Sequence, residues 1–393
     1  MLDESRPAPA IDWTVLAPLL VHVVVTHTVV GVVRVTVSYR TIELGLPPAW
    51  LGVISAGFAL LPIFLALRIG RYIDRGHDAH AAWIGSILML LASAELWAWP
   101  DTGTYLLVFT ILLGTGHMFL MASQQMLAVR CANRQGRDDA FGYFMVAVSL
   151  GQGLGPYIAG LAGSGVTVPT TGPLFAIGAL LAVVCLVISF AIRPAPKREV
   201  SGDQPTVSLM ALLRRPGMPA VLIASVVTVT ASDLLMIYLP LLGAERHIDA
   251  GHIGNLLMTR ALAALVARIF YARLIRHMGR LPLTLASTFM ASGAFVLMAV
   301  PSLPVMYAAA VAIGLGLGIA STLTISGIVE VAPPNARATA MTLRITGNRI
   351  SLVLMPFVGG LIAAATGVAG ILLVTAMSLS ACAAGMQIGR KES

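Results

Sequence analysis

Charged residues are scarce in this sequence. They make up 11% of its 393 residues, whereas 58% of the residues are hydrophobic. The mean hydropathy is +0.89. Soluble domains carry about 25% charged residues, so this composition excludes a soluble globular protein.

Cysteines and catalytic motifs are scarce as well. Cys131, Cys185 and Cys382 are scattered in or beside apolar runs, which indicates neither a disulfide framework nor a metal site. The chain has no HExxH, GxSxG, paired CxxC or GxxxxGK motif, so no site for metal hydrolysis, acyl transfer or ATP use is visible. We therefore expect no enzyme, no metal and no cofactor.

Long apolar blocks, such as Trp13–Val37 and Tyr105–Val129, are abundant instead. Each can cross a hydrocarbon core of about 30 Å as a helix of roughly 20 residues, and the alternation typical of a membrane barrel is absent. The predicted fold class is an all-α membrane protein with twelve transmembrane helices in two pseudo-symmetric six-helix bundles. The predicted spans are 14–39, 51–70, 81–99, 104–129, 140–162, 172–192, 218–243, 252–275, 281–301, 304–328, 338–364 and 367–389.

Basic residues indicate the orientation of these spans. With both termini in the cytoplasm, only Arg40 and Arg246 fall on the outer side. This asymmetry predicts a multi-pass protein of a bacterial-type cytoplasmic (inner) membrane with both termini cytoplasmic. It also accounts for the net charge of +8 without a nucleic-acid partner.

The chain repeats itself with an offset of about 200 residues. We expect an N-terminal bundle (1–192), a charged cytoplasmic linker (193–217) and a C-terminal bundle (218–393). Two six-span repeats are typical of a secondary transporter whose halves rock around a central site, and they suit a channel less well. A sensor usually has an additional cytoplasmic domain, and no such domain is predicted here. Positions that match between the repeats include Arg137 with Arg337, Pro156 with Pro356 and Gly160 with Gly360.

The loop after the second span reads "GRYIDRG". With the repeat, it resembles the major facilitator superfamily over essentially the whole chain. The resemblance implies that Gly70, Arg71, Asp74 and Arg75 form a conformational latch between the two halves. The end of the motif departs from the family pattern, because His77 and Asp78 replace its second glycine and its last basic residue.

The fifth span contains Gly142, Gly151, Gly155, Pro156 and Gly160. Glycines four residues apart let another helix approach closely, and proline bends the span. The pattern resembles the antiporter motif of drug–proton exchangers, which implies a sealed interface between the halves and favours exchange; simple tight packing is the alternative. The arginine common in the fourth span of those exchangers is absent here, which keeps symport as an alternative.

Arg34 lies in the apolar run "VVGVVRVTVSYRT", where a charge costs at least about 2.5–3.5 kcal/mol. The repeat places Asp233 at the equivalent position of span seven, and each of the two precedes a tyrosine by five residues. We predict an Arg34–Asp233 pair across the cavity that couples protons to transport, with Asp233 as the titrating group; a static pair that fixes packing is the alternative.

The predicted function is secondary active transport of a small organic solute by alternating access, as proton-coupled efflux (antiport); a proton-coupled symporter that imports an organic anion is the alternative. The surplus of arginines favours an anionic or zwitterionic solute. His27 and His117 are further candidates for titration. The expected partners are the solute, protons and the lipid bilayer, and the chain is expected to be a monomer. The predicted solute-binding residues are Arg34, Tyr39, Gln124, Gln125, Tyr238, Arg260, Asn348 and Arg349.

Overall fold

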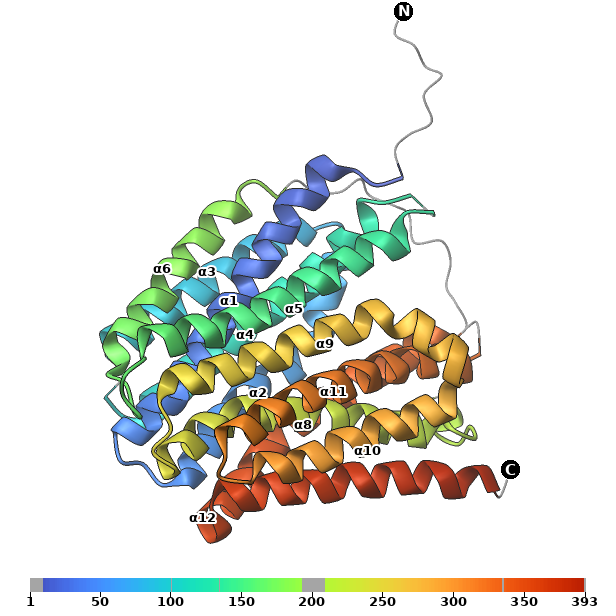
Figure 1. Ribbon diagram of the computed structural model, residues 1–393. Helices are drawn as coiled ribbons and strands as arrows, with labels where there is room; N and C mark the ends of the chain where they lie inside the picture. The colour runs from blue at the N-terminus through green and yellow to red at the C-terminus, as the bar shows by residue number, and fades with distance from the viewer. Residues whose placement is uncertain (1–9, 100, 134, 193–208, 334–335, 392–393) are drawn as a thin grey trace, which may run out of the picture.

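The computed structural model describes residues 10–99, 101–133, 135–192, 209–333 and 336–391, and it consists of long, roughly aligned helices (Figure 1). The first half contains α1 (Trp13–Glu43), α2 (Pro48–Asp74), α3 (Asp78–Ala98), α4 (Gly103–Arg130), α5 (Arg137–Ala162) and α6 (Thr171–Ser189). The second half contains α8 (Met218–Glu245), α9 (Ala250–Met278), α10 (Arg280–Met298), α11 (Leu303–Val331) and α12 (Arg337–Lys391).

Helix α12 accounts for two membrane spans. Gly367 interrupts it with a φ of 72°, a left-handed conformation that glycine adopts without strain. The amide of Val368 then donates to both carboxylate oxygens of Glu245 at 3.2 and 3.3 Å, which supplies a partner where the helix resumes. With ten other membrane-length helices, this confirms the expected all-α membrane fold of about twelve spans.

One short helix was not expected. Helix α7 (Leu209–Leu213) lies in the predicted linker, and Leu212 packs with Met218 and Ile328 in a small apolar cluster. The first part of the linker, 193–208, lies outside the described residues. The boundaries 1–192, 193–217 and 218–393 stay predictions.

The two halves meet along three helix pairs: α2 with the first part of α12, α5 with α9, and α1 with α8. Helix α1 begins and α12 ends on the same side of the molecule (Figure 1), which we call the terminal side. The opposite side, which contains the α1–α2 and α8–α9 connections, is called the distal side. In Figure 1, α5 and α9 run side by side along the boundary between the halves.

The halves are joined tightly on the distal side. A hydrophobic cluster there combines Val35 and Tyr39 of the first half with Tyr238 and Leu242 of the second. A Cβ added to Gly52 would lie 2.3 Å from the carbonyl oxygen of Pro356, so α2 and α12 approach to backbone contact. The distal side is therefore closed.

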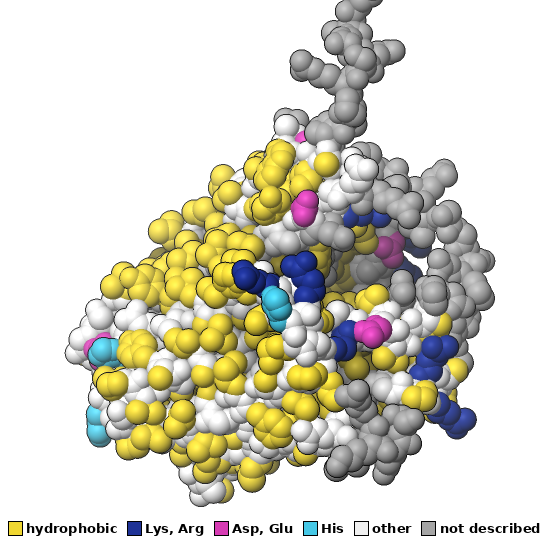
Figure 2. Space-filling model, turned by 45° about the vertical axis from the view of Figure 1, so that its right-hand side comes forward, with side chains coloured by type: hydrophobic (Ala, Val, Ile, Leu, Met, Phe, Trp, Pro, Cys, Tyr) yellow, Lys and Arg dark blue, Asp and Glu magenta, His cyan; other side chains and the backbone are white. Residues whose placement is uncertain are grey.

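The terminal side is different. Its apolar clusters each belong to one half: Ile69 and Ile73 pack with Ala81 in the first, and Leu283 packs with Leu323 in the second. Figure 2, turned so that this side comes forward, shows a hollow between the halves with basic side chains at its edge. The structure is therefore open toward the terminal side.

Candidate functional site

An ion pair joins the two halves near the centre of the molecule. Arg34 of α1 donates from Nη1 to Asp233 Oδ1 at 2.6 Å and from Nη2 to Oδ2 at 3.1 Å. The side chains are only 11% and 13% exposed, so the pair is largely shielded from water. The predicted contact is thus present. Its bidentate geometry is the strongest arrangement that a guanidinium and a carboxylate form.

The pair lies next to the cluster that closes the distal side, which we call the distal seal, on the side of the cluster that faces the terminal side. Tyr39 and Tyr238 follow Arg34 and Asp233 by five residues toward the distal side, and both are buried in the cluster that joins the halves. Both tyrosines are therefore closed off from the open side in this conformation, and their predicted contact with the solute stays a prediction. Tyr238 donates to the carbonyl of Pro356 at 2.7 Å, whereas the hydroxyl of Tyr39 has no partner among the described residues.

The ring of Phe58 covers one side of Arg34, and two histidine rings of the first half lie behind it. The guanidinium carbon lies 4.6 Å from the centre of the Phe58 ring, a distance typical of a cation–π contact. His117 lies against the same phenylalanine at 5.3 Å and against His27 at 5.2 Å. Both ring nitrogens of His117 and Nε2 of His27 are buried without a partner among the described residues.

The second half contributes three further arginines to the region between the halves. Arg260 of α9 is buried and donates to the hydroxyl of Ser232 at 2.8 Å, and Arg349 of α12 is partly exposed. Both lie within electrostatic reach of Asp233. Arg268 of α9 reaches across to the hydroxyl of Ser149 on α5. Sequence reasoning missed Arg268, although its position eight residues after Arg260 within one span was the available signal.

The two glutamines of α4 face different ways. Gln124 is buried inside the first half, where its amide donates at 2.9 Å to Thr26 and bonds at 2.9 Å to His22. The structure therefore corrects its predicted place in the cavity: its amide is used to hold α4 against α1. Gln125 is partly exposed and stays a candidate.

Asn348 connects α12 to α8. Its amide oxygen accepts from Ser225 at 3.2 Å, and the same serine accepts a longer bond from Arg344 at 3.4 Å. Asn348 is partly exposed, so its predicted contact with a solute stays a prediction.

The predicted latch lies at the terminal end of α2, and its role stays a prediction. Gly70 to Arg75 close α2 at the terminal side, and Asp74 and Arg75 are exposed there. Among the described ion pairs, none involves Asp74 or Arg75. Asp78, from the part of the motif that departs from the family, is instead fully buried and accepts from Arg130 at 2.5 Å.

The glycines of α5 pack against both halves. A Cβ on Gly151 would lie 2.6 Å from the Cβ of His27, and one on Gly155 would lie 2.6 Å from the Cα of Gly31, so these two hold α5 against α1. Gly160 meets Gly254 of α9 with an equivalent distance of 2.7 Å. Gly142 has open space around it and takes no part in this packing.

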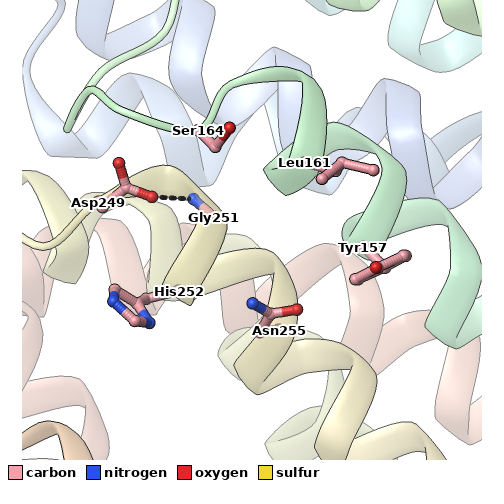
Figure 3. A pocket seen from close by; sticks show the side chains of 7 residues that line it. All are labelled: Tyr157, Leu161, Ser164, Asp249, Gly251, His252 and Asn255. Atoms are coloured by element: carbon pink, nitrogen blue, oxygen red, sulfur yellow. Dashed lines mark hydrogen bonds between the residues drawn. The ribbon is translucent and has the colours of Figure 1, made fainter.

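A separate small pocket lies between α5 and α9 on the distal side (Figure 3). At the edge of the pocket, Asp249 joins the segment after α5 to the start of α9, because its carboxylate accepts from the amides of Gly165 at 2.5 Å and Gly251 at 2.7 Å. The volume is about 210 Å³, below the roughly 300–1,000 Å³ of typical ligand pockets. The pocket is lined by Tyr157, Leu161, Ser164, Asp249, Gly251, His252 and Asn255.

Comparisons with known proteins agree with this architecture. Residues 10–243 and 221–386 match the family "Major Facilitator Superfamily". The search of the curated proteins gave no match. Solved structures show the same fold at low identity. The nucleoside transporter NupG has 13% identity and a TM-score of 0.78 over 96% of this chain and 99% of that one.

Two other solved structures give similar values. A bacterial homologue of the human lysosomal transporter Spinster, in an inward-facing and unoccupied conformation, has 13% identity and a TM-score of 0.74 over 95% of this chain and 94% of that one. A POT family transporter in complex with 5-aminolevulinic acid has 14% identity and a TM-score of 0.76 over 95% of each chain. These likenesses establish the fold.

Proposed function

The chain belongs to the major facilitator superfamily, whose members are secondary transporters of small solutes and not enzymes, and from this premise we propose that it couples an organic anion to protons. The observation that carries the proposal is the Arg34–Asp233 pair, which bridges the halves directly below the distal seal. Breaking the pair removes a contact that holds the distal side closed. Occupancy of the site is thereby linked to opening.

The sign of the coupling follows from what breaks the pair. An anion that binds Arg34 releases Asp233, and a proton that neutralises Asp233 releases Arg34, so the two favour each other's binding. A cation would compete with the proton for Asp233 instead. The same pair therefore supports co-transport of protons with an anion, or exchange of protons for a cation.

The surrounding charges favour the anion. Arg260, Arg268 and Arg349 form no ion pair among the described residues, although Asp233 lies within electrostatic reach of Arg260 and Arg349. Proton–anion symport, the alternative kept open by the sequence, is thus the first candidate. Proton-coupled efflux remains the second, because the glycine face of α5 packs against α1 and α9 as the resemblance to the exchangers implies.

We further propose that the terminal side is cytoplasmic, in a bacterial-type inner membrane. The ends of the helices on this side carry Arg71, Arg130, Arg273 and Arg280, whereas the distal side has Arg40 and Arg246. The conformation is then inward-facing. On this side, Gly70, Arg71, Asp74 and Arg75 at the end of α2 form the conformational latch of the proposal. A monomer suffices, because one chain encloses the whole cavity.

Thermal unfolding of the purified protein tests the coupling. Small organic anions, zwitterions, cations and neutral compounds are compared at pH 6 and pH 8; a ligand at 100 times its Kd adds about 2.7 kcal/mol. Symport predicts that anions stabilise, more strongly at pH 6, and that Arg34→Gln abolishes the effect. Exchange predicts that cations stabilise the protein, more strongly at pH 8, and that this stabilisation is lost when Asp233 is replaced.

The control for this experiment is Arg276→Gln. Arg276 is an exposed arginine of α9 that donates to the carbonyl of Ala272, one turn away. Anion stabilisation that is the same in Arg34→Gln, Arg276→Gln and the unmodified protein would refute the proposed role of the central pair.

A further inference from the structure

Two arginines of α9, Arg260 and Arg268, carry charges that the described protein does not neutralise. They are eight residues apart, about 12 Å along the helix, and lie within electrostatic reach of each other. Arg260 bonds to Ser232, and its Nε is buried with no partner among the described residues. Arg268 bonds to Ser149.

Asp233 does not compensate for these charges. It is the carboxylate within electrostatic reach of Arg260, but both of its oxygens are bonded to Arg34. Arginine stays protonated in proteins, so it does not become neutral by losing a proton. The two guanidinium groups are bonded only to serine hydroxyls, so their positive charges lack an anionic partner among the described residues.

The side chain of Arg268 points toward the centre of the protein and not toward the water at the end of the helix. On the facing helices, Gly160 lies against Gly254, and Gly153 lies against Met258 and Ala261. Continuing this antiparallel register puts Ser149 nearer the distal side than Arg268. Because Arg268 contacts Ser149, its side chain extends inward, away from the terminal end of α9, whereas a snorkelling arginine extends outward.

We propose that Arg260 and Arg268, together with Ser149 and Ser232, form a second anion subsite, and that the transported solute is a dicarboxylate. One carboxylate occupies Arg34 and Arg349, and the other occupies the forks of Arg260 and Arg268, whose geometry matches a planar carboxylate. Ser149 belongs to the first half and Arg268 to the second, so a bound dicarboxylate contacts both halves at two points. This inference rests on the proposed transport of an anion and gives it a substrate class.

Succinate and butyrate are the probes, because they have the same number of carbons but two carboxylates and one. Thermal stabilisation of the purified full chain is measured against each, at equal ionic strength. Succinate is expected to reach half-maximal stabilisation at a concentration at least about tenfold lower than butyrate, since a charge-assisted contact is gained. Arg268→Gln and Arg260→Gln are expected to bring succinate to the level of butyrate, while Arg276→Gln keeps the difference.

Arg260 is the more deeply buried arginine, so Arg260→Gln is the variant that is prone to fail in folding. In that case Arg268→Gln and Arg268→Lys alone test the subsite. Lysine keeps the positive charge but lacks the planar guanidinium, so Arg268→Lys is expected to retain part of the preference for succinate. Equal stabilisation by the two acids, no stabilisation by either, or full preference in Arg268→Gln overturns the subsite. Butyrate that stabilises through Arg34 while succinate is no better leaves the proposed anion transport intact.

Discussion

The two halves of this protein have the same arrangement of helices but opposite charges at equivalent positions. Arg34 of the first half corresponds to Asp233 of the second, 199 residues later. On the terminal side, Asp78 bonds to Arg130, and the corresponding residues of the second half, Arg280 and Glu330, form a pair with the signs reversed. If both first helices carried the same charge at this central position, the two halves would repel each other. Because the charges are opposite, the equivalent positions of the two repeats form an ion pair that joins the halves.

The interiors of the halves differ as well. The first half buries neutral polar groups: His22, Thr26, Gln124 and Ser86 form one network that holds α1, α3 and α4 together. The second half places two arginines of α9 toward the centre instead. We infer that the first half is mainly a scaffold that places one charged residue, Arg34, at the centre, and that the second half supplies most of the charge that binds the solute.

The largest expected effect comes from breaking the central pair on one side only. Asp233→Ala leaves Arg34 buried without its partner, and such losses cost about 3–5 kcal/mol. The double variant Arg34→Leu with Asp233→Leu removes both charges and is expected to recover most of that stability while transport stays lost. Thermal unfolding in detergent measures the first quantity, and uptake into proteoliposomes measures the second. A double variant as unstable as the single one would show that the pair is not the source of the loss.

The second prediction sharpens the comparison of the two terminal-side pairs. Asp78 and Arg130 are 0% and 9% exposed, whereas Glu330 and Arg280 are 66% and 32% exposed. Asp78→Asn is therefore expected to cost about 3 kcal/mol, as for a buried pair, and Glu330→Gln at most about 1 kcal/mol. High salt should lower the contribution of the exposed pair only. Equal shifts of the unfolding midpoint would mean that burial does not distinguish the halves.

Much of the fold was predictable because the membrane restricts the possible structures. Backbone groups in lipid must be satisfied within the segment, so each long apolar block becomes a helix, and the spans follow from length and hydropathy. The break of the last long helix fell at Gly367, where two spans were predicted to meet. The short helix α7 was missed, because five residues with one buried leucine give no periodic pattern.

The site was predictable only where the repeat supplied a constraint. The contact of Arg34 with Asp233 followed from equivalent positions and opposite sign. The burial of Gln124, Tyr39 and Tyr238 was not predicted, because which face of a helix meets the cavity depends on packing and on conformation. Arg268 was missed because its serine partner belongs to the other half, 119 residues away, and no sequence pattern connects the two.

A third prediction concerns the glycines of α5. In Gly160→Ala, the added methyl group would lie 2.7 Å from the Cα of Gly254, so the distal seal must open or shift, at a cost of about 1–3 kcal/mol. The population should move away from the conformation described here. Gly142→Ala is the matched control, because nothing lies within 4 Å of its added carbon. Distances between spin labels on the distal ends of α5 and α9 measure the shift; no difference between the two variants would contradict the assigned packing.

The smallest effect is expected at the two tyrosines that occupy equivalent positions in the repeats. Tyr238 donates to the carbonyl of Pro356, so Tyr238→Phe removes one buried hydrogen bond and should cost about 1 kcal/mol. The hydroxyl of Tyr39 has no partner among the described residues, so Tyr39→Phe should be neutral or slightly stabilising. Unfolding midpoints of the two variants, measured side by side, give the difference directly. A cost at Tyr39 equal to that at Tyr238 would show that its hydroxyl also has a hydrogen-bond partner, such as a buried water. The two tyrosines would then contribute equally to the distal seal.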